Sequence, residues 1–229
     1  MALGKTIDHY FKFILIILLF LLLSFNQDLA MIYILIIFAD YVWYKSDNFI
    51  SFPLSRGSNS GLITYFEAFA GFGAVMLASY ALINFFSPST ATAGLQSMFN
   101  LFATITPVLA DSKILTVISY AVLIPIIETS FFNGRLLEGL ATYSEIITGK
   151  KVDLNSASLG LTVIILVVAA LFALYHITAY NLQSTPLLVA FIFSIISSVL
   201  VLRQRELKGA IVLHILVNTV GVASAMGWI

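Results

Sequence analysis

The sequence predicts an all-α protein, a multi-pass transmembrane bundle of about seven or eight helices. Of its 229 residues 60% are hydrophobic, only 10% are charged, and the mean hydropathy is +1.03. A soluble domain carries about 25% charged residues. We therefore expect one integral-membrane domain, with N-terminal transmembrane helices over residues 1–110 and a core over residues 111–229 that carries the polar motifs described below.

Seven apolar runs approach the roughly 20 residues that a membrane crossing needs. The first is expected to be a retained helix rather than a signal peptide, because no small-residue cleavage site follows it. A weaker run over 95–110 contains Pro107, and we expect a half-helix or an interfacial segment there. The seven runs cover residues 10–25, 29–44, 62–86, 114–148, 159–180, 186–202 and 209–229.

The positive charges lie almost entirely on one side of this arrangement. With seven crossings, the opposite side holds Lys113 alone. Cytoplasmic loops carry the excess of lysine and arginine, so we expect an integral protein of a prokaryotic plasma membrane with a cytoplasmic N-terminus. The residues on the N-terminal side are Lys5, Lys12, Lys45, Arg56, Lys150, Lys151, Arg203, Arg205 and Lys208, with Arg135 if it reaches the surface.

Composition excludes several classes of function. The formal net charge is zero, so we expect the lipid bilayer and not nucleic acid as a partner. The chain has no cysteine, which removes disulfides, thiolate metal sites and a cysteine nucleophile together.

Three ionisable side chains lie inside apolar runs, and they are the candidate site. Glu128, His176 and His214 occupy three separate segments. Placing a carboxylate at the centre of a bilayer costs at least ~2.5 kcal/mol on insertion scales. Residues four apart share a helix face, which pairs Phe172 with His176 and His214 with Asn218.

These residue types suit hydrolysis. A glutamate can act as general base on a water, and an asparagine can orient an imidazole or donate to a developing oxyanion. The plainer alternative for each histidine is a helix–helix hydrogen bond. Counting along straight helices argues against one compact site, because it puts His214 roughly 9 Å from the N-terminal side and His176 nearer the other side.

The three motifs resemble those of the CAAX protease and bacteriocin-processing (CPBP, or Abi) family of intramembrane proteases. That family carries Glu-Glu-x-x-x-Arg, Phe-x-x-x-His and His-x-x-x-Asn, in this order on separate helices. The resemblance covers about residues 122–220. It implies a glutamate-dependent endopeptidase in which Glu128 and His176 activate water while His214 and Asn218 hold the oxyanion. We assign no metal ligand, and the resemblance specifies no cofactor.

The chain departs from the family motif at two positions. The second glutamate is Thr129 here, and the arginine is Asn133. They are four residues apart, so we expect them to hydrogen-bond each other or a shared neighbour. Arg135 lies seven residues after Glu128, where it either supplies the missing positive charge or extends to the cytoplasmic surface.

Two other functions stay open at this point. A catalytically degenerate relative would serve as a structural subunit or chaperone of a membrane complex, with membrane proteins as partners instead of a peptide or protein-tail substrate. A transporter would use Glu128 and the histidines as a proton relay, but the sequence shows no twofold repeat.

Overall fold

The structure is a computed structural model that describes residues 14–15, 17–23, 26–44, 62–86, 113–149 and 158–229. These residues form helices and connecting turns, without an extended strand. Within these described ranges, four helices are long and apolar enough to cross a membrane, and shorter apolar helices accompany them. The all-α membrane bundle predicted from the sequence is confirmed. The loop over 45–61 and the run over 95–110 lie outside the described residues.

One continuous helix, Lys113–Thr148, is the axis of the fold, and we call it the long helix. Gly149 ends it at φ +63°, a left-handed backbone that glycine adopts without strain. Two of its turns are π-helical, and each widens the helix by one residue. In order the long helix consists of α5 (Lys113–Thr116), η2 (Val117–Leu123), α6 (Ile124–Thr129), η3 (Ser130–Leu136) and α7 (Leu137–Thr148).

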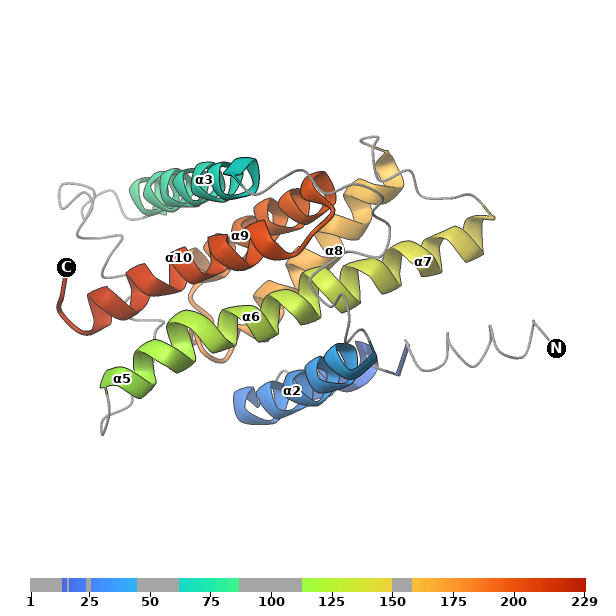
Figure 1. Cartoon of the computed structure of the whole chain (residues 1–229), viewed down its shortest axis with the longest axis horizontal. Coiled ribbons are helices and arrows are strands. Elements are labelled where there is room, and N and C mark those ends of the chain that lie inside the picture. Colours follow the sequence, from blue (N-terminus) through green and yellow to red (C-terminus); the bar gives the residue numbers. More distant parts are fainter. Residues whose placement is uncertain (1–13, 16, 24–25, 45–61, 87–112, 150–157) are drawn as a thin grey trace.

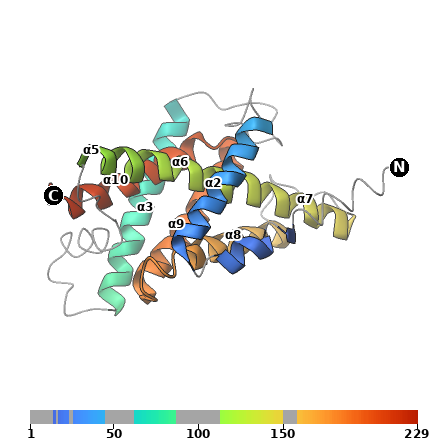
Figure 2. The same ribbon diagram turned by 90° about the horizontal axis from the view of Figure 1, so that it is seen from below.

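Helices α3 (Leu62–Phe86) and α2 (Gln27–Tyr44) lie on opposite sides of the molecule (Figure 1). Helix α2 crosses the long helix and contacts α6 and η3, as the turned view in Figure 2 shows. Between the long helix and α3 lies α10 (Lys208–Ala225), which packs on η2 and α6. Helix α9 (Ser184–Gln204) packs against α3, α10 and α8 (Leu159–Tyr175).

Polar side chains join the start of α3 to the end of α9. The Gln204 amide nitrogen donates to the Thr64 carbonyl at 3.2 Å and to a Glu67 carboxylate oxygen at 2.9 Å. The other Glu67 oxygen pairs with Arg203 at 2.7 Å. The start of α3 and the end of α9 therefore lie on the same side of the bundle, as an arrangement of alternating crossings requires.

Helix α8 ends five residues before the expected Tyr180. The ring nitrogen Nδ1 of His176 lies 2.9 Å from the Phe172 carbonyl oxygen, a group that the last turn of a helix leaves without a backbone partner. Asn181 and Leu182 then take left-handed backbone angles, with φ of 48° and 60°. The chain turns back into α9 earlier than hydropathy predicts, because the residues of this turn are themselves apolar.

The orientation of the bundle stays a prediction, and cysteine labelling tests it. The chain has no native cysteine, so one introduced at Ile229, which is 50% exposed, reports without background. We expect a membrane-impermeant thiol reagent to label Ile229→Cys on intact cells, because the loop charges place this end outside. Lys208→Cys, at the other end of α10, is the matched control and should react only after lysis. The reverse pattern would contradict the seven-crossing arrangement.

Candidate active site

Glu128 lies in the interior of the long helix, at a place where the helix geometry changes. It belongs to the six-residue α6, between the π segments η2 and η3. Single π turns inside α-helices occur frequently at functional sites. The residue is only 3% exposed, so its carboxyl group is enclosed by protein.

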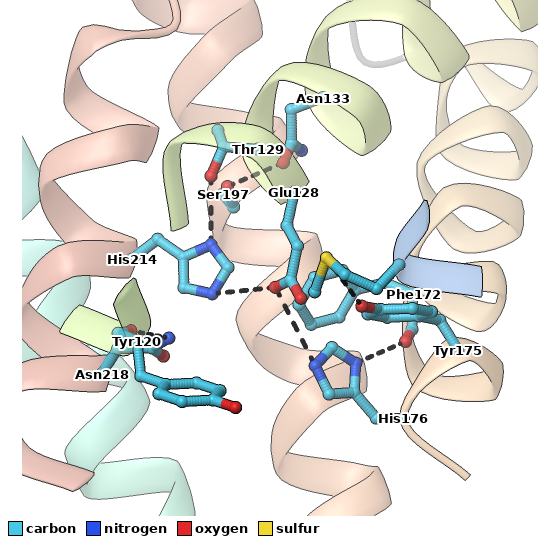
Figure 3. Close-up of polar contacts among 11 residues, drawn as sticks. Tyr120, Glu128, Thr129, Asn133, Phe172, Tyr175, His176, Ser197, His214 and Asn218 are labelled. Carbon is cyan, nitrogen blue, oxygen red and sulfur yellow. Dashed lines mark hydrogen bonds and ion pairs between the residues drawn. The ribbon is translucent and has the colours of Figure 1, made fainter. Parts of the chain in front are cut away.

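His214 reaches Glu128 from α10. Its Nε2 lies 3.5 Å from Oε2 of Glu128, and both side chains are 4% exposed. On the other side of the ring, Nδ1 lies 3.1 Å from the hydroxyl oxygen of Thr129. Consecutive residues of the long helix thus contact the two nitrogens of one imidazole (Figure 3).

His176 reaches the same carboxylate oxygen from the end of α8. Its Nε2 lies 4.0 Å from Oε2 of Glu128. Nδ1 bonds the Phe172 carbonyl, so Nδ1 carries the proton and Nε2 presents a lone pair. Aromatic rings hold the imidazole, with centroids 4.5 Å away for Phe172, 4.8 Å for Tyr175 and 5.1 Å for the stacked Tyr180.

The two histidines are level with each other, contrary to the count along straight helices. Phe193, in the middle of α9, contacts Phe172 at a centroid distance of 5.4 Å and His214 at 4.6 Å. The count treated the chain as helical from Lys151 to His176, whereas α8 begins at Leu159 and only 17 helical residues precede the histidine. Figure 3 shows the carboxylate of Glu128 between the two imidazoles.

Asn218 lies one turn after His214 on α10, and its amide is already engaged. The Nδ2 group donates to the backbone carbonyl of Tyr120 at 2.9 Å. Tyr120 belongs to η2, where the π turn changes the backbone hydrogen bonding. An amide has two N–H groups, and among the described residues only this one contact of the Asn218 amide is seen.

The expected contact between Thr129 and Asn133 is wrong. Thr129 faces α10, whereas Asn133 faces α9, where its Nδ2 donates to Ser198 at 2.9 Å and its Oδ1 accepts from Ser197 at 3.1 Å. The two residues do share one side of the long helix, but two different helices pack against that side. Neither polar side chain faces lipid, since both are nearly fully buried.

Arg135 does not supply a charge to Glu128. It lies inside η3, and no hydrogen bond or ion pair joins it to the described residues. Residues seven apart share a face only in a regular α-helix. The π segment between Glu128 and Arg135 changes the angle between their side chains around the helix axis, so the two residues no longer share a face. Arg135 is half-buried, and its extension to the cytoplasmic surface stays a prediction.

Several neighbours of the site were missed in the sequence. Tyr175 and Phe193 contribute rings, and in Figure 3 the Tyr175 hydroxyl points toward Glu128. Ser197 and Ser198 were overlooked although buried serines in an apolar helix are a recognisable sign of helix–helix hydrogen bonds. Within the described part of the chain, no three histidine, cysteine or acidic residues form a group suited to holding a metal ion.

The Asn133 contacts predict a loss of stability. Hydrogen bonds between transmembrane helices contribute ~0.6 kcal/mol on average, so Asn133→Leu, which removes two, should lower the free energy of unfolding by about 1 kcal/mol. Reversible unfolding in mixed micelles measures it. The same change in a Ser197→Ala, Ser198→Ala background should cost clearly less, because the partners are already gone. Equal costs in both backgrounds would show that the contacts contribute nothing.

Comparison with known proteins finds a related family over the part of the chain that contains these residues. A family model described as Rce1-like, type II CAAX prenyl endopeptidase, matches residues 110–220. The matched region begins just before the long helix and contains Glu128, His176, His214 and Asn218. Neither the search of curated proteins nor that of solved structures finds a match.

Proposed function

We propose that this chain, a divergent member of the CAAX protease family over residues 110–220, is a glutamate-dependent endopeptidase that hydrolyses peptide bonds within the membrane. One observation carries the proposal. The same buried carboxylate oxygen of Glu128 has the Nε2 atoms of two histidines, from two other helices, at 3.5 Å and 4.0 Å. Burying three titratable groups together is costly, and water activation gives the arrangement a use.

The gap between Glu128 and His176 suits a nucleophilic water. A distance of 4.0 Å is too long for a direct hydrogen bond. One water can bridge it, and both neighbouring atoms are acceptors once Glu128 is ionised. Such a water donates one hydrogen bond to each acceptor, which leaves the lone pairs of its oxygen free for attack. Glu128, assisted by His176, then takes a proton as the oxygen attacks the scissile carbonyl.

His214 and Asn218 supply the stabilisation of charge. As the water attacks, the carbonyl oxygen becomes an oxyanion, which needs preorganised N–H donors in a dry site. His214 is adjacent to the carboxylate and almost completely buried. Asn218 lies on the same face one turn further along α10, and its second amide N–H is directed by the bond of the first to Tyr120.

A non-catalytic role is the second candidate, and the contacts of the two divergent residues favour it. Thr129 and Asn133 both bond neighbouring helices, to His214 and to the α9 serines. Polar pairs of this kind hold transmembrane helices together. In this case the protein would be a structural subunit or chaperone of a membrane complex, and a folded wild type would cleave nothing.

Proteolysis by the purified protein in lipid distinguishes the two candidates. The substrates are membrane-tethered peptides, among them tails with a C-terminal prenylated cysteine motif, each with an unprenylated copy. Cleavage that stops when Glu128 is changed supports the endopeptidase. Absence of cleavage across the library by folded wild-type protein would favour the structural role.

A further inference from the structure

We infer that Thr129 is a positioning residue whose hydroxyl donates to Nδ1 of His214, and so stabilises the tautomer in which Nε2 carries the proton and faces Glu128. The inference deepens the proposed function and rests on it for its catalytic meaning. Its structural half concerns only a hydroxyl and an imidazole, and it is measurable without any substrate.

The contact between the two side chains is short and fully enclosed. The Thr129 hydroxyl oxygen lies 3.1 Å from Nδ1 of His214. Thr129 is 1% and His214 4% exposed, so bulk water does not compete for either group. The same residue pair joins α6 to α10, two helices that pack directly on each other. A neutral imidazole has one protonated nitrogen, and the partner of one nitrogen decides the state of the other.

The partners on the two sides of the ring favour one assignment. Nε2 faces an oxygen of Glu128 at 3.5 Å, and an ionised carboxylate only accepts hydrogen bonds. A proton on Nε2 therefore faces a hydrogen-bond acceptor, the Glu128 carboxylate. A lone pair on Nε2 would instead face the negative charge of that carboxylate. Nδ1 is then the acceptor, and the Thr129 hydroxyl can donate to it. A carboxylate in place of this hydroxyl would accept from Nδ1 and impose the opposite tautomer.

This assignment gives the two histidines complementary roles. His176 is protonated at Nδ1 by its bond to the Phe172 carbonyl and presents a lone pair at Nε2. His214 presents an N–H at the same height. His176 thus accepts a hydrogen bond from the water that Glu128 deprotonates. Once Glu128 has taken that proton, the Nε2–H of the neutral His214 can turn from the carboxyl group to the developing oxyanion. The Thr129 hydroxyl lies at Nδ1, whereas Glu128 lies at Nε2, so we expect the effect of Thr129 on the site to pass through His214.

Nitrogen-15 spectra of histidine-labelled protein in lipid bilayers test the tautomer. The chain has three histidines, and His176→Gln and His214→Gln variants assign the signals. We expect His214 in the wild type to be protonated at Nε2. Thr129→Val keeps the shape but removes the hydroxyl, and should raise the fraction of the tautomer protonated at Nδ1, whereas Thr129→Ser should restore the wild-type signal. Ser130→Ala is the matched control, because its hydroxyl bonds its own backbone at the Ile126 carbonyl.

Kinetics supply the catalytic half of the test. Removing the outer hydrogen-bond partner of a metal-bound histidine typically costs ~10–100-fold. We expect a loss of the same order in kcat for Thr129→Val, with little change in KM. Thr129→Ser should recover most of it. A wild-type His214 protonated at Nδ1 overturns the inference even if the valine variant fails to fold. A changed tautomer with unchanged kcat overturns the catalytic half alone. If the wild type cleaves nothing, the proposed endopeptidase fails while the spectra still decide the role of Thr129.

Discussion

Replacing Glu128 by glutamine should lower the rate of peptide-bond cleavage by ~10²–10⁴-fold, the usual contribution of a general base. The amide has nearly the shape of the carboxylate but cannot take a proton from water. The residue is 3% exposed, so bulk water does not substitute for the carboxylate as the base. The measurement is the single-turnover rate on the best substrate found for the wild type, with purified protein in the same lipid.

The same substitution should leave the fold intact or make it more stable. A buried carboxylate carries a desolvation cost, and the described residues provide Glu128 with no lysine or arginine partner. Glu67→Gln is the control, because Glu67 is a second acid among the helices but pairs with Arg203 far from the site. That variant should keep full activity and lose some stability. Equal cleavage by the wild type and Glu128→Gln would exclude the glutamate mechanism.

Removing the imidazole of His176 should have an effect of similar size. The ring presents a lone pair 4.0 Å from Glu128, and without it a water at this position loses half of its hydrogen bonds to the protein. We expect His176→Phe and His176→Ala each to lower the cleavage rate by ~10²–10⁴-fold. Phenylalanine keeps ring contacts with Phe172, Tyr175 and Tyr180, whereas alanine leaves a cavity.

The comparison of these two variants separates chemistry from packing. A chemical role predicts that both are equally inactive and that only alanine is destabilised. Recovery of activity in His176→Phe would show that the ring merely fills space. Combined with Glu128→Gln, either change should cost little more, because residues that act on one water are strongly non-additive. Additive losses would indicate two independent roles.

Hydropathy predicted the elements of the fold well where a helix is apolar and has polar ends. The third run coincides with α3, Leu62–Phe86. Hydropathy predicted the end of α8 wrongly, since the residues of the following turn are as apolar as the helix itself. The two π segments were not predicted either. Their hydrogen bonding depends on which helices pack beside them, and the sequence has no local signal for that beyond Pro125, whose missing N–H and bulky ring disturb a regular α-turn.

For the candidate site, residue types and spacing indicated the four principal residues, and the structure brings Glu128, His176 and His214 together. The roles assigned to them stay predictions. The contacts of Thr129 and Asn133 were predicted wrongly, because the four-residue rule describes neighbours on one helix and not the helices that cover them. Partner choice depends on tertiary packing, which α9 and α10 provide here.

The two π segments also determine where this helix tolerates a change of length. Each contains one residue more than an α-helical turn of the same span, so the loss of one residue there is absorbed by local rewinding, and the flanking helices keep their directions. The six residues of α6 are regular α-helix and contain no such extra residue. A deletion among them would turn Glu128 by about 100° relative to one of its flanks. Natural variation in length should therefore accumulate on either side of the carboxylate and avoid the short stretch between.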